Sequence, residues 1–552
     1  MPLTHPVSHA HEWYKGHMLS RQADNRLSSV LVATTAVLVA LCLWYNHAWF
    51  YDDTDITLRY ARHLAQGLGP RWNIAGPPVE GFTSPLHVFA VAALLKLHVA
   101  DRLAVRLISF AGHIVLLAFL WRWTRARFGQ LAAVLTTCAV AVSFPLLVWD
   151  LGGLEAVPFA ALCTAGTLFC FDYLESSNRR DLLWGGVLLG IAAFTRMDGA
   201  VAAIAALLAV LLLSKAPLRQ RVIDVVLSGL IVVASLVPWQ IFRELYFHAP
   251  LPNTYYAKVY GIPLGWRVRN GLLYWKIYLK LAPYPAEILF LIAVVQLLRR
   301  RVSRLSLALW LWLLIMAAYI VTTGGDHMFA ARFMVTLVPI FALASVIGLL
   351  QIGALSTPAL ASSVAALFLV TSALQFRNEI LNPRYESSSS LAGTIVGNSM
   401  RALIPAGSLV GLNVAGAMPY VDDDLNYIDM LGLNDYEIAR RNPVPIDPAK
   451  HPVVVGHLKG DGLSVLRRHP DVLLLGPPSG QLAKGWLTLG DSEIVAAPEF
   501  ARDYRLCSAP LIVTPQERAQ LALVHLTADV QIYYYVRRGS RVVCERDLSQ
   551  AQ

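Results

Sequence analysis

Charged residues are scarce in this sequence. They make up 15% of its 552 residues, whereas hydrophobic residues make up 56%. Soluble domains usually carry about a quarter charged residues, so the composition excludes an ordinary soluble protein and predicts many membrane-spanning helices. The net charge of +10 therefore indicates basic cytoplasmic loops rather than a surface that binds nucleic acid.

Several sequence patterns are missing as well. There is no G-x-x-x-x-G-K and no G-x-G-x-x-G after a strand, so nothing points to a bound nucleotide. No internal repeat is visible, although transporters usually have one. The first apolar run, 27–47, has no small-residue cleavage site behind it. We therefore expect an uncleaved anchor, preceded by a cytoplasmic tail over residues 1–26.

Cysteine is rare, with six residues in the whole chain. Four of them lie in apolar runs, where we expect inert packing residues. The other two, Cys507 and Cys544, lie in the polar C-terminal region. They can form a disulfide if that region is outside the cytoplasm, but sequence separation leaves open whether they meet.

Apolar runs of about the length that crosses a bilayer dominate residues 27–375. A span needs about 20 apolar residues, and we predict about eleven transmembrane helices. The runs are 27–47, 103–121, 130–149, 154–174, 182–195, 199–213, 222–245, 284–298, 304–322, 332–351 and 355–374. The two short runs, 182–195 and 199–213, are separated by Arg196 and Asp198 and have basic outer flanks, which favours two spans over one.

The positions of the basic clusters predict the topology. The run Pro85–Leu97 is short, and treating it as an interfacial helix on the outer face puts every basic cluster on the side of the N-terminus. The prediction is a cytoplasmic N-terminus, with two large outer loops over residues 48–102 and 246–283. Residues 376–552 then lie outside, and their short apolar runs between turn-rich stretches predict an α/β domain.

Three carboxylates, Asp52, Asp53 and Asp55, follow the first predicted span in WFYDDTDITLRY. Carboxylates beside hydrocarbon are costly unless paired or hydrated, which marks a candidate functional site. The alternative is a solvated loop with an Asp55–Arg59 helix pair. Asp52 and Asp53 precede a helical segment, whose N-terminus favours anions, as a general base requires. Adjacent acids also suit a divalent cation.

Other charged residues fall on the same predicted face. Glu80 is either an exposed loop residue or a binding residue. Lys258 stands in PNTYYAK within a segment of cations and aromatics, a pattern that fits either a phosphate site or an ordinary aromatic belt. Arg332, in GGDHMFAARF, has the planar donor fork that suits phosphate. Arg196 and Asp198 in TRMDG are alternatively a satisfied ion pair.

The C-terminal region contains an acidic stretch, PYVDDDLNYIDMLGLNDYEIAR, over residues 419–440. Its carboxylates are suited to binding a cation or a sugar. The simpler interpretation is an acidic loop exposed to solvent, and we adopt it as the expectation.

The order of these motifs resembles the GT-C fold glycosyltransferases. The motifs are the acid pair, RYARHLAQGLGPRWNIAGPPVEGFTSPL, GLE, TRMDG, LPNTYYAK, GGDHMFAARF and IDMLGLND. More narrowly, the chain is similar to the branch that contains the mycobacterial terminal arabinofuranosyltransferase and related bacterial proteins, including a flagellar motor control group. The resemblance covers about residues 40–440 and leaves the acceptor open.

The resemblance implies transfer of a sugar, with arabinofuranose as one candidate, from a polyprenyl-phosphate donor to a glycan or lipid acceptor. The reaction would take place on the outer face of the bacterial plasma membrane. Asp52 and Asp53 match the catalytic acid pair, which is a base or a ligand of a divalent cation. Residues implied to bind the donor phosphate or substrate are Arg59, Arg196, Lys258, His327 and Arg332. From its place in the first outer loop, Glu80 is a further candidate. The alternatives are a transporter or flippase of lipid-linked glycans and a non-catalytic membrane scaffold.

Overall fold

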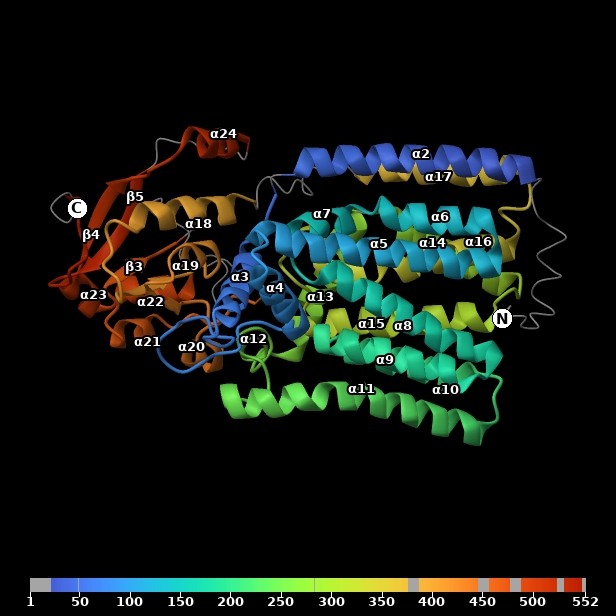
Figure 1. Ribbon diagram of the computed structural model, residues 1–552, viewed down its shortest axis with the longest axis horizontal. Coiled ribbons are helices and arrows are strands. Elements are labelled where there is room, and N and C mark those ends of the chain that lie inside the picture. The colour runs from blue at the N-terminus through green and yellow to red at the C-terminus, as the bar shows by residue number, and fades with distance from the viewer. Residues whose placement is uncertain are drawn as a thin grey trace.

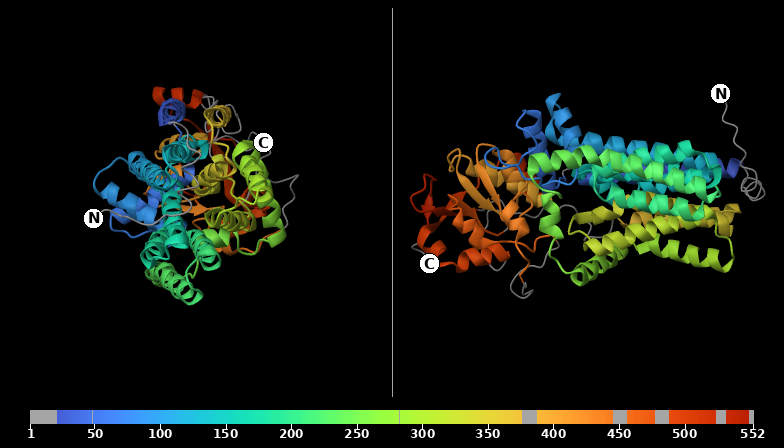
Figure 2. Two further views of the ribbon diagram at one scale, coloured as in Figure 1. Left: turned by 90° about the vertical axis from the view of Figure 1, so that its right-hand side faces the viewer. Right: turned by 90° about the horizontal axis from the view of Figure 1, so that it is seen from below.

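The computed structural model describes residues 21–47, 49–281, 283–375, 387–444, 456–476, 488–523 and 531–548. Residues 1–20 of the predicted tail and residues 376–386 therefore lie outside the described part. Figures 1 and 2 show an elongated molecule with a bundle of long helices at one end and a sheet with short helices at the other. Between them lie α3 (Asp52–Ala65), α4 (Pro85–Lys96) and α12 (Asn253–Lys258).

Every apolar run that predicted a span forms helix in the bundle. The helices that these runs form are α2 (Arg21–Asn46), α5 (Asp101–Phe128), α6 (Gln130–Ala141), α7 (Phe144–Gly152), α8 (Ala156–Ser176), α9 (Arg179–Thr195), α10 (Gly199–Leu213), α11 (Leu218–Phe247), α14 (Pro283–Leu298), α15 (Arg304–Thr323), η1 (Phe329–Thr336), α16 (Val338–Ile352) and α17 (Pro358–Gln375). A further helix, α13 (Leu264–Leu281), contacts α15 and does not come from a predicted span. By length and composition, 5 described helices can cross a membrane, or 7 if two bent pairs each count as one span.

Both bent pairs have local causes. α6 and α7 meet at 51°, where Pro145 at the start of α7 cannot continue the preceding hydrogen-bond ladder. Residues 330–336 meet α16 at 58°. Pro339 in the first turn of α16 cannot continue the preceding hydrogen-bond ladder there. A separate kink lies earlier, within GGDHMFAARF, where Ala330 and Ala331 have φ of 49° and 47°, a left-handed conformation that alanine rarely adopts.

The elements between the bundle and the sheet follow ordinary helix chemistry. α3 has three acids in its first turn and Arg62 and His63 in its last, an arrangement that complements the helix dipole. The acids thus belong to the first turn instead of preceding the helix. α4 begins with Pro85, where the missing N–H costs nothing. The predicted outer loop 246–283 contains two helices, α12 and α13.

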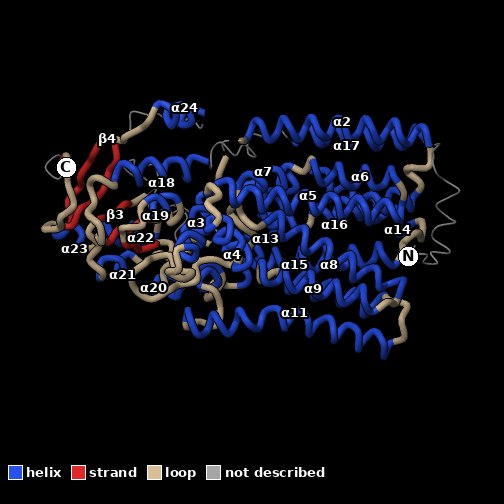
Figure 3. Tube along the Cα trace, viewed as in Figure 1, coloured by secondary structure: helices blue, strands red, loops and turns tan. Residues whose placement is uncertain are grey.

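The C-terminal part contains one six-stranded sheet in the order β2-β1-β3-β5-β4-β6. Its strands are β1 (Leu409–Leu412), β2 (Asn426–Asp429), β3 (Val472–Leu474), β4 (Tyr504–Pro510), β5 (Gln531–Arg537) and β6 (Arg546–Asp547). β2, β1 and β3 are parallel, with Val410 opposite both Tyr427 and Val472, and the remaining pairs are antiparallel. Figure 3 shows these strands at the end of the molecule away from the bundle.

Short helices pack around the sheet. They are α18 (Ser387–Met400), α19 (Ala417–Val421), α20 (Tyr436–Arg440), α21 (Gly462–Arg467), α22 (Leu489–Ala496), α23 (Pro498–Asp503) and α24 (Pro515–Leu523). Cys507 on β4 forms a disulfide with Cys544, which answers the question that the sequence left open, and the other four cysteines are free and buried. α19 and α18 contact α3, so this part of the chain lies against the segment that carries the acid cluster.

Candidate functional site

A cavity of about 480 Å³ lies among α3, α12, the α9–α10 turn and the segment before α16. Apolar, hydroxyl and charged side chains all line it. The charged residues in its wall are Asp53, Glu155, Arg196, Asp198, Lys258, Arg267, Asp326 and Arg332. Four are acidic and four are basic, so the charge of the wall is formally balanced. Which of them pair with each other decides what the cavity can bind.

Arg196 is held by two acids. Its Nη1 lies 2.5 Å from Glu155 Oε1 and its Nε lies 2.9 Å from Asp198 Oδ1. Burial alone would raise the pKa of Glu155, but the charges of Arg196 and Arg332 lower it to about 2. Glu155 is therefore ionised, and the charge of Arg196 is already compensated within the protein.

Arg332 is also paired, through the kink before α16. The left-handed residues Ala330 and Ala331 turn the chain back, so that Arg332 Nη2 lies 2.8 Å from Asp326 Oδ2. Burial would raise the pKa of Asp326, but the charge of Arg332 holds it well below its usual range. This pair, like that of Arg196, does not need a ligand to balance its charge.

Lys258 and Arg267 are different from the other two cations. Arg267 Nη1 donates to the carbonyl oxygen of Thr322 at 2.7 Å. Within the described residues, neither Lys258 nor Arg267 lies within ion-pair distance of a carboxylate. Unpaired cations in a partly buried wall attract an anion. They therefore define the part of the cavity that is suited to phosphate.

The two adjacent acids of α3 lie in opposite environments. Asp53 is in the cavity wall, and no described residue hydrogen bonds or ion pairs with its carboxylate. Asp52 is buried away from the cavity, where its Oδ1 accepts a hydrogen bond from the Ala417 N–H at 2.9 Å. Burial and the charge of Asp55 raise the pKa of Asp52 well above its usual range. Asp53 is thus the acid in position to act as a base.

Three of the predicted substrate-binding residues, Arg59, Glu80 and His327, are not among those lining the cavity. Arg59 is fully buried, with Nη1 2.8 Å from Asp423 Oδ1 and Nε 2.6 Å from the Trp72 carbonyl oxygen. It therefore pairs with Asp423 rather than with Asp55. Glu80 accepts hydrogen bonds from Arg243 at 2.6 Å and Trp239 at 3.2 Å.

His327 lies beside the cavity, with Nδ1 3.6 Å from Asp326 Oδ1. Its ring centroid is 4.6 Å from that of His457, which comes from the C-terminal part of the chain. Burial lowers the pKa of both imidazoles, and for His457 the neighbouring His327 adds to the effect. Both rings are therefore neutral near pH 7, so His327 contributes no fixed positive charge there.

The described residues do not assemble a metal site. No group of three or more His, Cys, Asp or Glu side chains among them is placed to hold an ion. Asp52 Oδ1 is engaged by a backbone N–H, which leaves Asp53 as the member of the pair that faces the cavity. Because a divalent cation usually takes several oxygen ligands, this donor set does not fit one, and we derive no step through a metal.

The expectation of a solvated acidic loop at residues 419–440 is wrong at four positions. Asp422, Asp429 and Asp435 are buried, and Asp423 is ion-paired. The Asp423 carboxylate lies 2.8 Å from Arg59 Nη1 and 3.1 Å from Arg62 Nη1, and it is the partner that holds α3. Sequence reasoning also missed Arg267 and Leu433 in the cavity wall. The motif IDMLGLND, which contains Leu433, was the available signal.

The chain is a membrane protein that combines a bundle of apolar helices, some long enough to span a membrane, with a charged cavity near the end that carries the sheet. The family described as dolichyl-phosphate-mannose-protein mannosyltransferase matches residues 82–242, and a domain of unknown function matches residues 381–533. No curated protein matches the chain.

Two solved structures of ArnT from Cupriavidus metallidurans are similar to the chain over nearly its whole length. The structure bound to undecaprenyl phosphate is 12% identical and covers 93% of this chain and 99% of its own, with a TM-score of 0.56. The apo structure is 12% identical and covers 92% and 98%, with a TM-score of 0.54. The chain has the fold of the GT-C membrane glycosyltransferases.

Proposed function

We propose that this protein is an inverting glycosyltransferase that moves a sugar from a polyprenyl-phosphate donor to a glycan or lipid of the cell envelope. The observation that carries the proposal is the contrast within the cavity wall. In the part of the chain that the structure describes, Asp53 has no hydrogen-bond or ion-pair partner, and neither Lys258 nor Arg267 is ion-paired with an acid. A carboxylate and two cations in the wall of one cavity, none of them ion-paired with a described residue, suit a reaction that removes a proton and releases a phosphate.

In the proposed reaction, an acceptor hydroxyl attacks the anomeric carbon of the sugar. A bond forms between that carbon and the acceptor oxygen, and the bond between the same carbon and the phosphate oxygen breaks. The acceptor proton passes to Asp53 as general base. The polyprenyl phosphate leaves with the electron pair, and Lys258 and Arg267 offset its negative charge. Attack opposite the leaving group inverts the configuration.

We also propose that the cavity opens on the outer side of a bacterial inner membrane, with the N-terminus in the cytoplasm and residues 376–552 forming an extracytoplasmic domain. The distribution of basic loops supports this orientation. The disulfide between Cys507 and Cys544 also supports it, because disulfides persist in oxidising compartments.

The test is donor cleavage in proteoliposomes that contain the purified protein. The first donor is an undecaprenyl-phosphate sugar labelled in the sugar, with arabinofuranose first because of the sequence resemblance. Acceptor-dependent release of undecaprenyl phosphate, with an inverted glycosidic bond in the product, is expected. Movement of the intact lipid across the bilayer without cleavage would replace the transferase with a flippase.

A further inference from the structure

The loop Asp429–Asp435, which follows β2 and is called here the Asp429 loop, has a shape set by one buried carboxylate. Asp429 is fully buried. Its Oδ1 accepts hydrogen bonds from the Leu431 and Gly432 N–H groups at 3.0 and 3.2 Å. Its Oδ2 accepts from the backbone and side-chain nitrogens of Asn434 at 2.8 and 3.0 Å. Gly432 has a φ of 87°, which glycine adopts without strain.

Asn434 joins the Asp429 loop to α3. Its Nδ2 is bound to Asp429, which directs Oδ1 toward the Tyr60 hydroxyl at 3.0 Å. The same hydroxyl also lies 2.7 Å from the Val79 carbonyl oxygen, so that its single proton is shared between this oxygen and Asn434 Oδ1, and it accepts the Gly81 N–H at 2.9 Å. A side chain at Gly81 would bring a Cβ within 1.9 Å of Asn434 Oδ1, so the packing requires glycine there. The Asn434 amide and the Tyr60 hydroxyl thus link three segments by hydrogen bonds, namely α3, the segment before α4 and the Asp429 loop.

Asn253 joins the same loop to α12. Its Nδ2 donates to the carbonyl oxygens of Gly432, Leu433 and Asp435 at 2.9, 3.0 and 3.0 Å. Its Oδ1 accepts from Arg440 Nη1 at 2.7 Å. Asn253 is the first residue of α12 and is buried. The start of the helix that carries Lys258 is therefore bonded to the loop.

These joints connect three segments that line the cavity. α3 carries Asp53, α12 carries Lys258, and Leu433 of the Asp429 loop lines the same cavity. Figure 1 shows α3, α12 and α20, the helix after the loop, together at the junction of bundle and sheet. α12 and α20 are in contact.

We propose that the Asp429 loop fixes the position of α3 relative to α12, and that Asn434 and Asn253 are positioning residues for Asp53 and Lys258. The consequence for catalysis rests on the proposed function, whereas the geometric claim does not. A displacement of about 1 Å at a reacting group costs up to about 100-fold in rate. A loop that contains no catalytic group therefore controls the reaction through the two segments that it joins.

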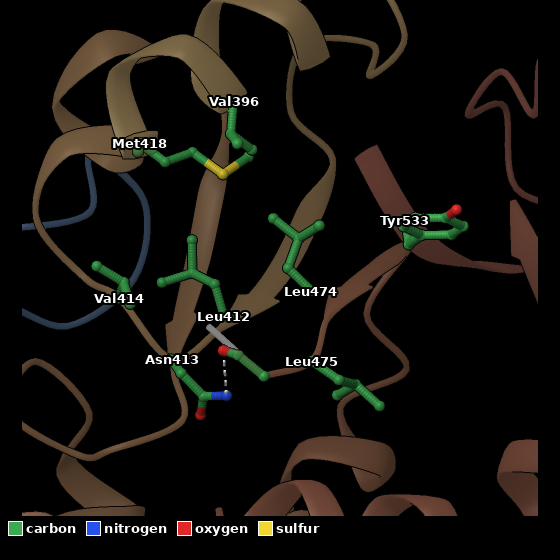
Figure 4. A pocket seen from close by; sticks show the side chains of 10 residues that line it. Val396, Leu412, Asn413, Val414, Met418, Leu474, Leu475 and Tyr533 are labelled. Carbon is green, nitrogen blue, oxygen red and sulfur yellow. Dashed lines mark hydrogen bonds between the residues drawn. The ribbon is translucent and has the colours of Figure 1, made fainter. Parts of the chain in front are cut away.

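Asn413 provides a matched control. Like Asn434, it is 5% exposed and follows a strand of the parallel half of the sheet. Its Nδ2 also donates to a buried carboxylate, that of Asp491, at 2.9 Å. It lines a separate apolar pocket of about 30 Å³, shown in Figure 4, where its amide donates to the Gly476 carbonyl oxygen. The Asn413→Ala variant therefore removes a buried polar side chain whose hydrogen bonds involve neither α3 nor α12.

The geometric claim is tested by electron paramagnetic resonance distances between spin labels at Gln66→Cys, just after α3, and Tyr255→Cys, on α12. The native cysteines are either buried or in the disulfide, so the labels attach to the introduced thiols. Asn434→Ala and Asn253→Ala should broaden or shift the distance distribution, and Asn413→Ala should leave it unchanged. A wild-type distribution in Asn434→Ala overturns the proposal.

If Asn434→Ala does not fold, Tyr60→Phe serves as the second variant. It keeps the ring and removes only the hydroxyl, and the same change in distances is expected. An unchanged distribution in Tyr60→Phe would then count against the Asp429 loop as the joint.

The catalytic consequence is tested by transfer from an undecaprenyl-phosphate sugar, normalised to folded protein. Asn434→Ala should lower kcat by about 10- to 100-fold with little change in KM for the donor, because Lys258 and Arg267 remain. Asn413→Ala should retain the wild-type kcat. Equal losses in both variants would show a purely structural role. If the wild-type protein transfers no sugar, the proposed function fails and the distance measurement still decides the position of α3.

Discussion

The two sides of α3 use the same kinds of charged residue in opposite ways. On the side facing the C-terminal sheet, Arg59 and Arg62 share Asp423, and Asp55 accepts a hydrogen bond from Ser390 at 2.6 Å. On the cavity side, Asp53 has no partner among the described residues, although it is only two positions from Asp55. The C-terminal part of the chain supplies hydrogen-bond and ion-pair partners to the charged residues on one side of α3. Within the described residues it supplies none to Asp53 on the cavity side.

We propose that this difference separates the charges that stabilise the fold from those that take part in the reaction. A buried charge is costly unless a partner compensates it. The ion pair with Asp423 therefore allows the charged Arg59 side chain to remain buried. Unpaired groups in a cavity wall gain their partners only when a ligand binds. By this criterion Arg196 and Arg332, although they line the cavity, belong with the paired group, and Lys258 and Arg267 belong with Asp53.

The largest effect is expected from removing the central acid of the paired side. Asp423→Asn leaves the Arg59 charge buried without compensation, so the free energy of unfolding should fall by about 3–5 kcal/mol. Denaturant unfolding in detergent micelles measures it. The control is Asp503→Asn, which breaks the exposed contact with Arg502 and should change little. Equal, small changes in both variants would show that the contact does not hold α3.

The next effect concerns the unpaired cations. Lys258→Gln removes a charge-assisted contact worth about 1.5–3 kcal/mol, so the affinity for undecaprenyl phosphate should fall by about 10- to 100-fold. Titration with the lipid in nanodiscs measures this affinity. Lys276→Gln, an exposed lysine on α13 that does not line the cavity, should bind as the wild type does. Wild-type affinity in Lys258→Gln would place the phosphate elsewhere.

A smaller effect follows from the pKa of Asp55, which burial raises to about 7 against the opposing Ser390 hydrogen bond. The unfolded value is about 3.9. Between these values the folded state keeps a proton that the unfolded state has lost, so rising pH lowers stability until about pH 7, where the loss is complete. Relative to Asp55→Asn, the wild type should lose up to about 1.4 kcal/mol per pH unit. If the free energies of unfolding of the wild type and Asp55→Asn changed in parallel between pH 4 and 8, this prediction would be wrong.

The smallest effect is expected at the kink before α16. Ala331 has a left-handed conformation that costs about 1–2 kcal/mol, and Ala331→Gly should relieve part of it and stabilise the protein by about 0.5–1 kcal/mol. Ala342→Gly, within the regular helix α16, should instead destabilise it by about 1 kcal/mol. Thermal unfolding compares the two, and a loss of stability in both would show that the kink is not strained.

Local pattern predicted the helices because an apolar run of sufficient length has few other conformations available in a membrane. The same reasoning singled out Asp53 and Lys258, which stand in polar segments beside such runs. It was not able to assign partners. Arg59 and Asp423 are 364 residues apart in sequence, and Glu80 and Arg243 are 163 apart. Only the folded chain shows which charges compensate each other.

The contrast between Asp53 and Asp52 is measured most directly by single-turnover sugar transfer from a labelled undecaprenyl-phosphate donor. Asp53→Asn should lower the rate of the chemical step by about 10²- to 10⁴-fold. Asp52→Asn keeps an oxygen that accepts the Ala417 N–H, and its rate should stay within about tenfold of the wild type. Equal losses in both variants, or the greater loss in Asp52→Asn, would contradict the assignment of Asp53 as the base.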